Sequence, residues 1–254
     1  MTGERARSGL SSALALLTVV GGPAAPSPAA APWYPAVGAL LGATLGVAWW
    51  GLDRVLPAFV GGAVVLCLDL ALTGLLHADG LVDAADGLLP HLERARRLEV
   101  MREPATGAFG VTAALGVYAM RLAALASYRP AHAWTAVLLL GGMWAASRAL
   151  MTWAISRLAY ARPAGGLGAL YGGSTGGGGR RGALVAAGAW VVALAALLAW
   201  DRTAGAPVLL AVLVGGGAVL ALAVRRLGGY TGDVLGAAGV VGETLGLVVA
   251  VARW

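Results

Sequence analysis

The chain has 254 residues, of which 59% are hydrophobic and only 12% are charged. Soluble domains are typically about 45–50% apolar and about 25% charged, so this composition excludes an ordinary soluble domain and indicates an integral membrane protein. The net charge is +6 and every basic residue is an arginine, but the sequence has no basic patch with interleaved aromatic residues, so we expect the lipid bilayer as a partner and no nucleic acid.

The first 34 residues form an N-terminal segment that is either interfacial or flexible. Within it, residues 8–22 (SGLSSALALLTVVGG) are apolar, but this run is shorter than the roughly 20 residues that cross a bilayer. We expect an interfacial helix here. A cleaved signal peptide is the alternative, because Arg5 and Arg7 precede the run and small residues with prolines follow it.

Seven further apolar runs approach the length of a membrane span. They are rich in Gly and Ala, which is typical of membrane helices that pack closely. The sequence therefore predicts an all-α fold: a polytopic membrane helix bundle with about seven transmembrane helices, in a single integral membrane domain over residues 1–254. The expected spans are 36–52, 55–76, 107–128, 133–156, 182–200, 205–224 and 234–252.

Arginine is distributed unevenly between the two predicted sides. Twelve arginines lie in the N-terminal segment and in the second, fourth and sixth connections, whereas four lie in the other connections and the C-terminus. By the positive-inside rule the arginine-rich side is cytoplasmic. This predicts a multi-pass protein of the plasma membrane with a cytoplasmic active face, because the acidic motif described next lies on the same side.

The sequence HADGLVDAADG, at residues 77–87, places three carboxylates at a membrane boundary. Asp79, Asp83 and Asp86 fall within about 60° of one another on a helix. Carboxylates on one face repel each other, and Mg²⁺ prefers oxygen ligands, commonly one or two carboxylates plus substrate phosphates. We therefore expect all three to bind Mg²⁺, in a cytoplasmic-face motif region over residues 77–106. The alternative is that they face water at a helix start.

Arginines follow the acidic motif in RARRLEVMREPATGAFG. Arg97 and Arg102 are candidates for substrate binding, because a guanidinium group can bind phosphate through two hydrogen bonds. The alternative is a solvated helix with Glu–Arg pairs.

Polar residues also occur within or beside later spans. Arg148 either contacts phosphate or pairs with the intramembrane residue Asp69. Thr231 and Asp233 precede the last span, where Asp233 either caps the helix or contacts a metal or nucleotide.

These motifs together resemble the adenosylcobinamide-GDP ribazoletransferases, also called cobalamin 5′-phosphate synthases. HADGLVDAADG, RRLEVMRE and GAFG are similar to two blocks of that family, and ASR at 146–148, GLG at 166–168 and GGYTGDVLGA at 228–237 match further blocks in the same order. The resemblance covers roughly residue 35 to the C-terminus. It implies a membrane enzyme of late cobalamin assembly that joins adenosyl-GDP-cobinamide to α-ribazole, or its 5′-phosphate, and releases GMP.

The resemblance also implies Mg²⁺-assisted attack of a ribose hydroxyl on the cobinamide phosphate. It implies association with other cobalamin-assembly enzymes at the membrane. His77 matches the family histidine but lies about 160° around the helix from Asp79, so the alternative to catalysis is a capping or orienting role. The implied catalytic residues are Asp79, Asp83, Asp86 and His77, and the implied substrate-binding residues are Arg97, Arg102, Arg148, Thr231 and Asp233.

The sequence departs from the family pattern at two positions. Ala105 replaces an arginine, and Val240 replaces the first of two acidic residues, which leaves Glu243 alone. An alternative function is that of another intramembrane phosphoalcohol or prenyl transferase. Such enzymes need a second acidic motif, and none is evident in this sequence. A transporter is less consistent, because the sequence shows no inverted repeat.

Overall fold

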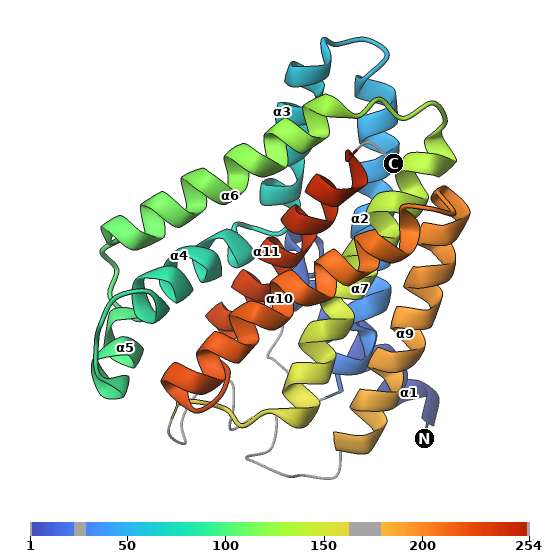
Figure 1. Ribbon diagram of the computed structural model, residues 1–254. Helices are drawn as coiled ribbons and strands as arrows, with labels where there is room; N and C mark the ends of the chain where they lie inside the picture. Colours follow the sequence, from blue (N-terminus) through green and yellow to red (C-terminus); the bar gives the residue numbers. More distant parts are fainter. Residues whose placement is uncertain (1, 23–28, 163–178, 253–254) are drawn as a thin grey trace.

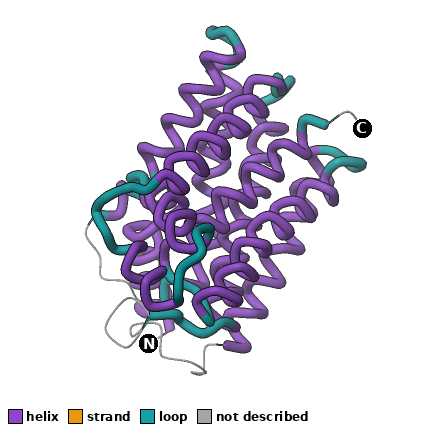
Figure 2. The backbone as a smooth tube through the Cα atoms, turned by 60° about the vertical axis from the view of Figure 1, so that its left-hand side comes forward, coloured by secondary structure: helices purple, strands orange, loops and turns teal. Residues whose placement is uncertain are grey.

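The computed structural model describes residues 2–22, 29–162 and 179–252, which form a bundle of α-helices (Figure 1). Within these residues β-type pairing is limited to one isolated bridge between Tyr160 and Tyr230. Figure 2 shows helices joined by short loops. The expected all-α fold is confirmed, whereas the GLG match at 166–168 lies outside the described residues. The elements are α1 Thr2–Leu17, η1 Val19–Gly21, η2 Ala31–Trp33, α2 Tyr34–Leu52, α3 Ala58–Leu72, α4 Leu76–Leu88, α5 Arg94–Val100, α6 Ala108–Ser127, α7 Ala133–Arg157, α9 Gly179–Trp200, α10 Gly205–Leu227 and α11 Gly232–Ala250.

Six helices in the described part of the chain are long and apolar enough to cross a membrane. They are α2 extended by η2, followed by α6, α7, α9, α10 and α11, and they correspond in order to six of the seven expected spans. The pair α3 and α4 forms a seventh, bent candidate. The chain is therefore a multi-pass membrane protein.

The second expected span, 55–76, is wrong as a continuous helix. α3 ends after 15 residues, and α4 starts four residues later with its axis turned by 88°. Between them Gly74 and Leu75 have φ angles of 57° and 62°, in the left-handed region that leucine rarely adopts. Hydropathy does not indicate this break because the residues on both sides are apolar.

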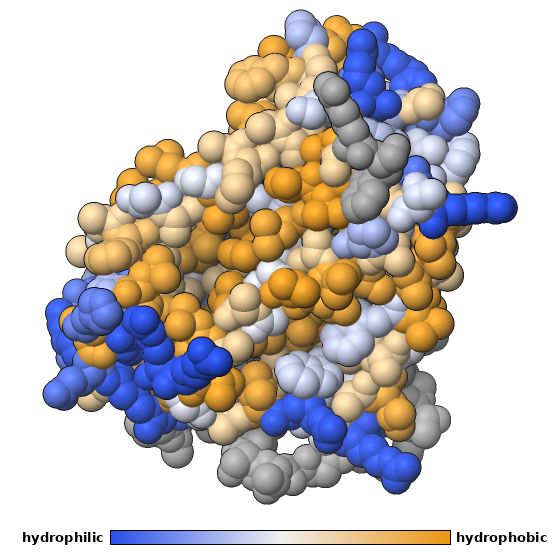
Figure 3. Space-filling model, viewed as in Figure 1, coloured by the Kyte–Doolittle hydropathy of each residue, from blue (hydrophilic) through white to orange (hydrophobic). Residues whose placement is uncertain are grey.

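The connections divide between the two ends of the bundle. In Figure 1 the lower end carries α5, residues 158–162 after α7 and the turn between α10 and α11, whereas the upper end carries the α2–α3, α6–α7 and α9–α10 links and the end of α11. Figure 3 shows hydrophilic side chains gathered at both ends, with a largely apolar band between them on the face in view. This pattern fits a bundle that crosses a bilayer. We call the lower end, where the arginines of residues 94–102 and 225–226 lie, the Arg-rich end.

Glycines bring pairs of helices into backbone contact. Along α2, Gly38, Gly42 and Gly46 face the backbone of α7, and a Cβ at Gly38 or Gly46 would lie 2.5 or 2.6 Å from a carbonyl oxygen of that helix. Gly216 and Gly242 bring α10 and α11 together in the same way. Membrane helices depend on such close packing because lipid provides little hydrophobic driving force.

The N-terminal segment contains the expected helix, α1, which packs on the bundle near the Arg-rich end. Its residues Ala13 and Leu17 are 0% and 3% exposed and belong to the same core cluster as Tyr34 and Tyr230. The helix is therefore part of the folded core, while its depth in the bilayer stays a prediction.

Candidate functional site

Asp79 and Asp83 lie one turn apart on α4, where this helix meets the start of α11. Asp79 is exposed and Asp83 is partly buried. Between them, Gly80 touches the backbone of Asp233: a Cβ at Gly80 would lie 2.9 Å from the Asp233 carbonyl oxygen. The glycine therefore lets the acidic face of α4 approach the first turn of α11.

Thr231 positions Asp233 at the start of α11. Thr231 is the N-cap, because its Oγ1 accepts a hydrogen bond from Val234 N at 3.2 Å. The same hydroxyl donates to Asp233 Oδ2 at 3.2 Å. Thr231 is fully buried, so the structure gives it a positioning role in place of the expected substrate contact. Asp233 is thereby not needed as the helix cap.

Arg162, in the segment after α7, forms an ion pair with Asp233. Its Nη2 lies 2.7 Å from Asp233 Oδ2, and the two side chains are 16% and 22% exposed. Backbone pairing fixes this segment: Tyr230 N donates to Ala159 O at 2.9 Å, and Ala161 N donates to Tyr230 O at 2.8 Å. The sequence reasoning missed Arg162, because nothing in its local sequence indicates a partner 71 positions away.

Asp83 experiences the charges of all these groups. The like charges of Asp79 and Asp233 repel its carboxylate, and the opposite charge of Arg162 attracts it. The site therefore holds three carboxylates and one guanidinium, and its excess negative charge attracts cations.

Asp86 turns towards α6 instead of joining this group. Its Oδ2 accepts a hydrogen bond from Gly107 N at 2.7 Å, and its Oδ1 accepts one from Gly110 N at 2.8 Å. Both positions require glycine, because a Cβ at either would lie 2.5 Å from a carboxylate oxygen. The helix dipole also favours a carboxylate at the start of α6. The structure thus gives Asp86 a capping role in place of the expected metal ligation.

The expected three-carboxylate metal site is not formed. No three His, Cys, Asp or Glu side chains among the described residues are arranged to share an ion. Asp86 lies about 10 Å further along the axis of α4 than Asp79, whereas Mg²⁺–oxygen distances are about 2.1 Å. Asp79 and Asp83 remain neighbouring carboxylates on α4, with Asp233 beside them. Two carboxylates completed by substrate phosphates and water are a usual Mg²⁺ environment, so this donor set fits Mg²⁺.

Arg97 supports the end of α4. It is buried, and its Nη1 donates to the carbonyl oxygens of Gly87 and Leu88 at 2.7 and 3.0 Å. Burial, followed by the positive charge of Arg226, lowers the pKa of Arg97 from its usual value. Arg97 therefore caps unpaired carbonyls at a helix end, and its expected phosphate contact stays a prediction.

Arg102, by contrast, is exposed and lines a cavity of about 580 Å³ at the Arg-rich end. Arg94 and Arg162 line the same cavity. Arg94 is held in place by the hydrogen bond from its Nε to Leu227 O at 2.7 Å. Because Arg162 also pairs with Asp233, the cavity adjoins the carboxylates. Three guanidinium groups beside a cation-attracting site suit a polyphosphate ligand, and sequence reasoning did not single out Arg94.

His77 lies beside Asp79 in a smaller pocket of about 130 Å³. The histidine is 6% exposed, and it lines this pocket together with Asp79 and Asp233. Its Nδ1 is buried and has no hydrogen-bond partner within the described residues. Other parts of the wall come from Leu16, Leu17, Tyr34, Tyr160 and Tyr230.

A buried network of two arginines and two acids lies deeper in the bundle. Arg121 Nη1 is 2.7 Å from Asp69 Oδ2, and its Nη2 is 2.9 Å from Glu243 Oε2. Arg148 pairs with the other oxygen of Glu243. The opposite charges balance, as ionisable groups inside a membrane require.

This network bears on the two roles considered for Arg148. Its side chain is 2% exposed and pairs with Glu243, whereas Asp69 takes Arg121 as its partner; the expected phosphate contact of Arg148 stays a prediction. Val240 lies beside this network, and its backbone carbonyl oxygen accepts a hydrogen bond from Arg121 Nη2 at 3.0 Å, a contact that does not depend on the side chain at this position.

Comparisons with known proteins agree with this arrangement. The family model for cobalamin-5-phosphate synthase matches residues 9–251. An adenosylcobinamide-GDP ribazoletransferase of Chlorobium phaeovibrioides is 33% identical over 252 residues, which cover 93% of this chain and 94% of the relative. One from Prosthecochloris aestuarii is 33% identical over 223 residues, 84% of each chain. One from Thermosynechococcus vestitus is 42% identical over 137 residues, 54% of each chain. No solved structure matches the chain. The chain therefore belongs to the cobalamin-5-phosphate synthase family of membrane transferases in cobalamin biosynthesis.

Proposed function

We propose that this chain joins adenosyl-GDP-cobinamide to α-ribazole, or to α-ribazole 5′-phosphate, and releases GMP. Relatives that align with most of the chain bear the name adenosylcobinamide-GDP ribazoletransferase. Within the structure, the ion pair between Arg162 and Asp233 carries the proposal, because it connects an arginine-lined cavity to the carboxylates of α4.

The proposed reaction exchanges a phosphoanhydride linkage for a phosphodiester linkage. A ribose hydroxyl forms a bond to the phosphorus that carries cobinamide, and the bond from this phosphorus to the bridging oxygen of the pyrophosphate breaks. GMP leaves with that oxygen and the bonding electron pair, and the hydroxyl loses its proton. Phosphoryl transfer depends mainly on positioning and on neutralising the phosphoryl oxygens.

The arginines of the cavity supply the positioning in this proposal. Arg94, Arg102 and Arg162 bind the pyrophosphate oxygens, and the planar guanidinium fork favours paired hydrogen bonds to phosphate. Arg94 and Arg162 are already fixed by contacts to Leu227 and Asp233, so little side-chain entropy is lost when the ligand binds.

Asp79 and Asp83 are the proposed Mg²⁺ ligands. A bound Mg²⁺ neutralises charge that develops on phosphoryl oxygens. Asp86 keeps the start of α6 against α4 and so supports the two ligands. His77, in the tautomer that carries its proton on Nε2, accepts a hydrogen bond at Nδ1 from the ribose hydroxyl and orients it.

The arginine asymmetry supports a location in the plasma membrane with the site facing the cytoplasm. The site lies at the Arg-rich end, which is the predicted cytoplasmic side. Association with other enzymes of cobalamin assembly stays a prediction, because no surface feature of the described residues identifies such a partner.

The decisive experiment measures GMP release by the purified protein from adenosyl-GDP-cobinamide and α-ribazole. Asp79→Asn and Asp83→Asn keep side-chain size but remove charge, so each should lower turnover by about 10² or more, because several kcal/mol of charge stabilisation is lost. Glu103→Gln, which neutralises an exposed carboxylate paired with Arg96, is the control and should stay near wild type. Wild-type turnover with an unchanged Mg²⁺ requirement in both aspartate variants would contradict the proposal.

A further inference from the structure

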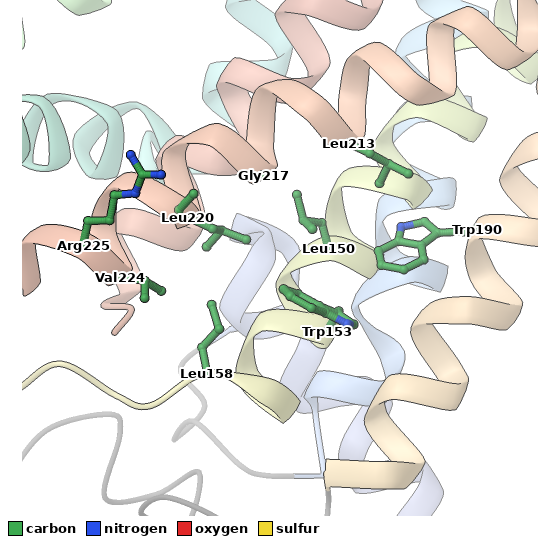
Figure 4. A pocket seen from close by; sticks show the side chains of 10 residues that line it. Leu150, Trp153, Leu158, Trp190, Leu213, Gly217, Leu220, Val224 and Arg225 are labelled. Carbon is green, nitrogen blue, oxygen red and sulfur yellow. The ribbon is translucent and has the colours of Figure 1, made fainter. Parts of the chain in front are cut away.

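An apolar groove runs between α7, α9 and α10, away from the carboxylates and the arginine cavity. Its volume is about 440 Å³. Figure 4 shows Val224 and Arg225 at one end of the groove and Leu213 and Trp190 at the other. The part of α10 from residue 213 to 225 rises about 18 Å, so the groove is long and narrow. It does not belong to the site described above.

The groove exists because one position on α10 has no side chain. A Cβ built at Gly217 would meet no atom within 4 Å. The neighbouring Gly216 behaves differently, since a Cβ there would lie 2.8 Å from Ala238 O of α11. Gly216 is therefore needed for helix packing, whereas Gly217 leaves space on the opposite side.

The walls of the groove suit a hydrocarbon chain. Leu150, Leu213 and Leu220 line it together with the rings of Trp153 and Trp190. The indole of Trp190 is fixed by a hydrogen bond from its Nε1 to Ala146 O at 3.1 Å.

Arg225 gives the groove a charged end. It lies in the last turn of α10, at the Arg-rich end, and its side chain is exposed. No carboxylate among the described residues lies within ion-pair distance of its guanidinium. An apolar channel that ends in a cation at a membrane surface is complementary to an anionic phospholipid, whose phosphate binds arginine while its acyl chain is buried.

We propose that this groove is a binding site for one anionic phospholipid, with an acyl chain along Gly217 and the headgroup phosphate on Arg225. The lipid fills the space between α7, α9 and α10, and it thereby contacts all three helices.

Native mass spectrometry of the full-length protein, transferred from bilayers with equal parts of phosphatidylglycerol and phosphatidylcholine, tests the proposal. The wild type should retain one phosphatidylglycerol. Gly217→Leu fills the groove and should abolish this retention, whereas Gly116→Leu is the matched control, because a Cβ at Gly116 also meets no atom within 4 Å but lies on α6. Circular dichroism confirms that both variants are folded.

Charge is tested separately with Arg225→Gln. Loss of one basic contact should reduce the preference for phosphatidylglycerol over phosphatidylcholine by about fivefold. Arg202→Gln, which removes an exposed arginine from the opposite end, should leave the preference unchanged. Equal retention of both lipids by the wild type, or equal loss in the two leucine variants, overturns the proposal. A change from dimer to monomer in Gly217→Leu with unchanged lipid binding also overturns it, since the groove then holds a second copy of the chain.

Discussion

Arg162 donates a hydrogen bond to Asp233 at 2.7 Å, and this contact joins the segment after α7 to the first turn of α11. The same guanidinium lines the arginine cavity, and the same carboxylate lies beside those of α4. One pair of residues therefore connects the two halves of the proposed site.

Replacement of Arg162 should affect catalysis more than folding. Arg162→Gln removes a charged hydrogen bond worth roughly 1.5–3 kcal/mol, so kcat/KM should fall by about 10- to 100-fold. Arg162→Lys keeps the charge but not the planar fork and should recover only part of the activity. Steady-state GMP release measures both, with Arg157→Gln as the control because Arg157 is exposed at the end of α7. Equal kcat/KM in all three variants would remove Arg162 from the site.

Asp86→Asn should behave as a stability variant. The amide oxygen can replace only one of the two carboxylate oxygens that accept hydrogen bonds from Gly107 and Gly110, which should cost about 1–3 kcal/mol of unfolding free energy. Thermal unfolding in detergent measures the loss, and a Mg²⁺ titration of the remaining activity should keep its wild-type midpoint. An altered Mg²⁺ midpoint with unchanged stability would instead show that Asp86 binds the metal.

Arg97→Ala and Arg102→Ala should separate structure from substrate binding. Loss of the buried Arg97 leaves the carbonyl oxygens of Gly87 and Leu88 without their donor, so expression and thermal stability should fall. Arg102→Ala should raise the KM for the GDP-linked substrate, because this exposed residue lines the cavity, and should leave stability near wild type. The reverse pattern would show that Arg97 binds phosphate.

In the buried network, a double replacement that keeps the charges balanced should destabilise the protein less than a single replacement. Arg121→Met leaves Asp69 and Glu243 with only Arg148, and breaking a buried pair typically costs about 3–5 kcal/mol. Adding Asp69→Leu removes the uncompensated charge, so the double variant should unfold at a higher temperature than Arg121→Met alone. A double variant that is less stable than the single one would show that the pair is not coupled in this way.

The orientation of the bundle is open to reporter fusions. Fusions after residues 90, 165 and 228 should report the cytoplasm, and a fusion after 202 the opposite side, because the first three lie in the arginine-rich connections. A periplasmic signal after residue 90 would reverse the proposed location of the site.

The sequence predicted the positions of the membrane helices, but it did not predict the break between α3 and α4. Six spans emerge from apolar runs alone, because a membrane helix needs continuous hydrophobicity and little else. The break at Gly74 and Leu75 depends on two left-handed residues, and one of them is a leucine that no propensity rule places there.

Helical periodicity predicts only part of the candidate site. Helical spacing correctly places Asp79 and Asp83 together. Asp86 lies about two turns beyond Asp79 on α4, and there it meets the start of α6. Arg162 lies in an irregular segment and Arg94 at the first residue of the short helix α5. Their roles arise from contacts with Asp233 and Leu227, which are far away in the sequence.

The short length of α3 determines how deep the chemistry lies. Its 15 residues rise about 22 Å, less than the roughly 30 Å of a hydrocarbon core. A chain that enters the hydrocarbon core at the start of α3 therefore reaches the turn at Gly74 before it leaves that core, and Asp79 follows this turn by about one helical turn. For the proposed function, this placement requires the phosphate groups of the corrinoid substrate to reach below the lipid headgroups to meet Asp79 and Asp83.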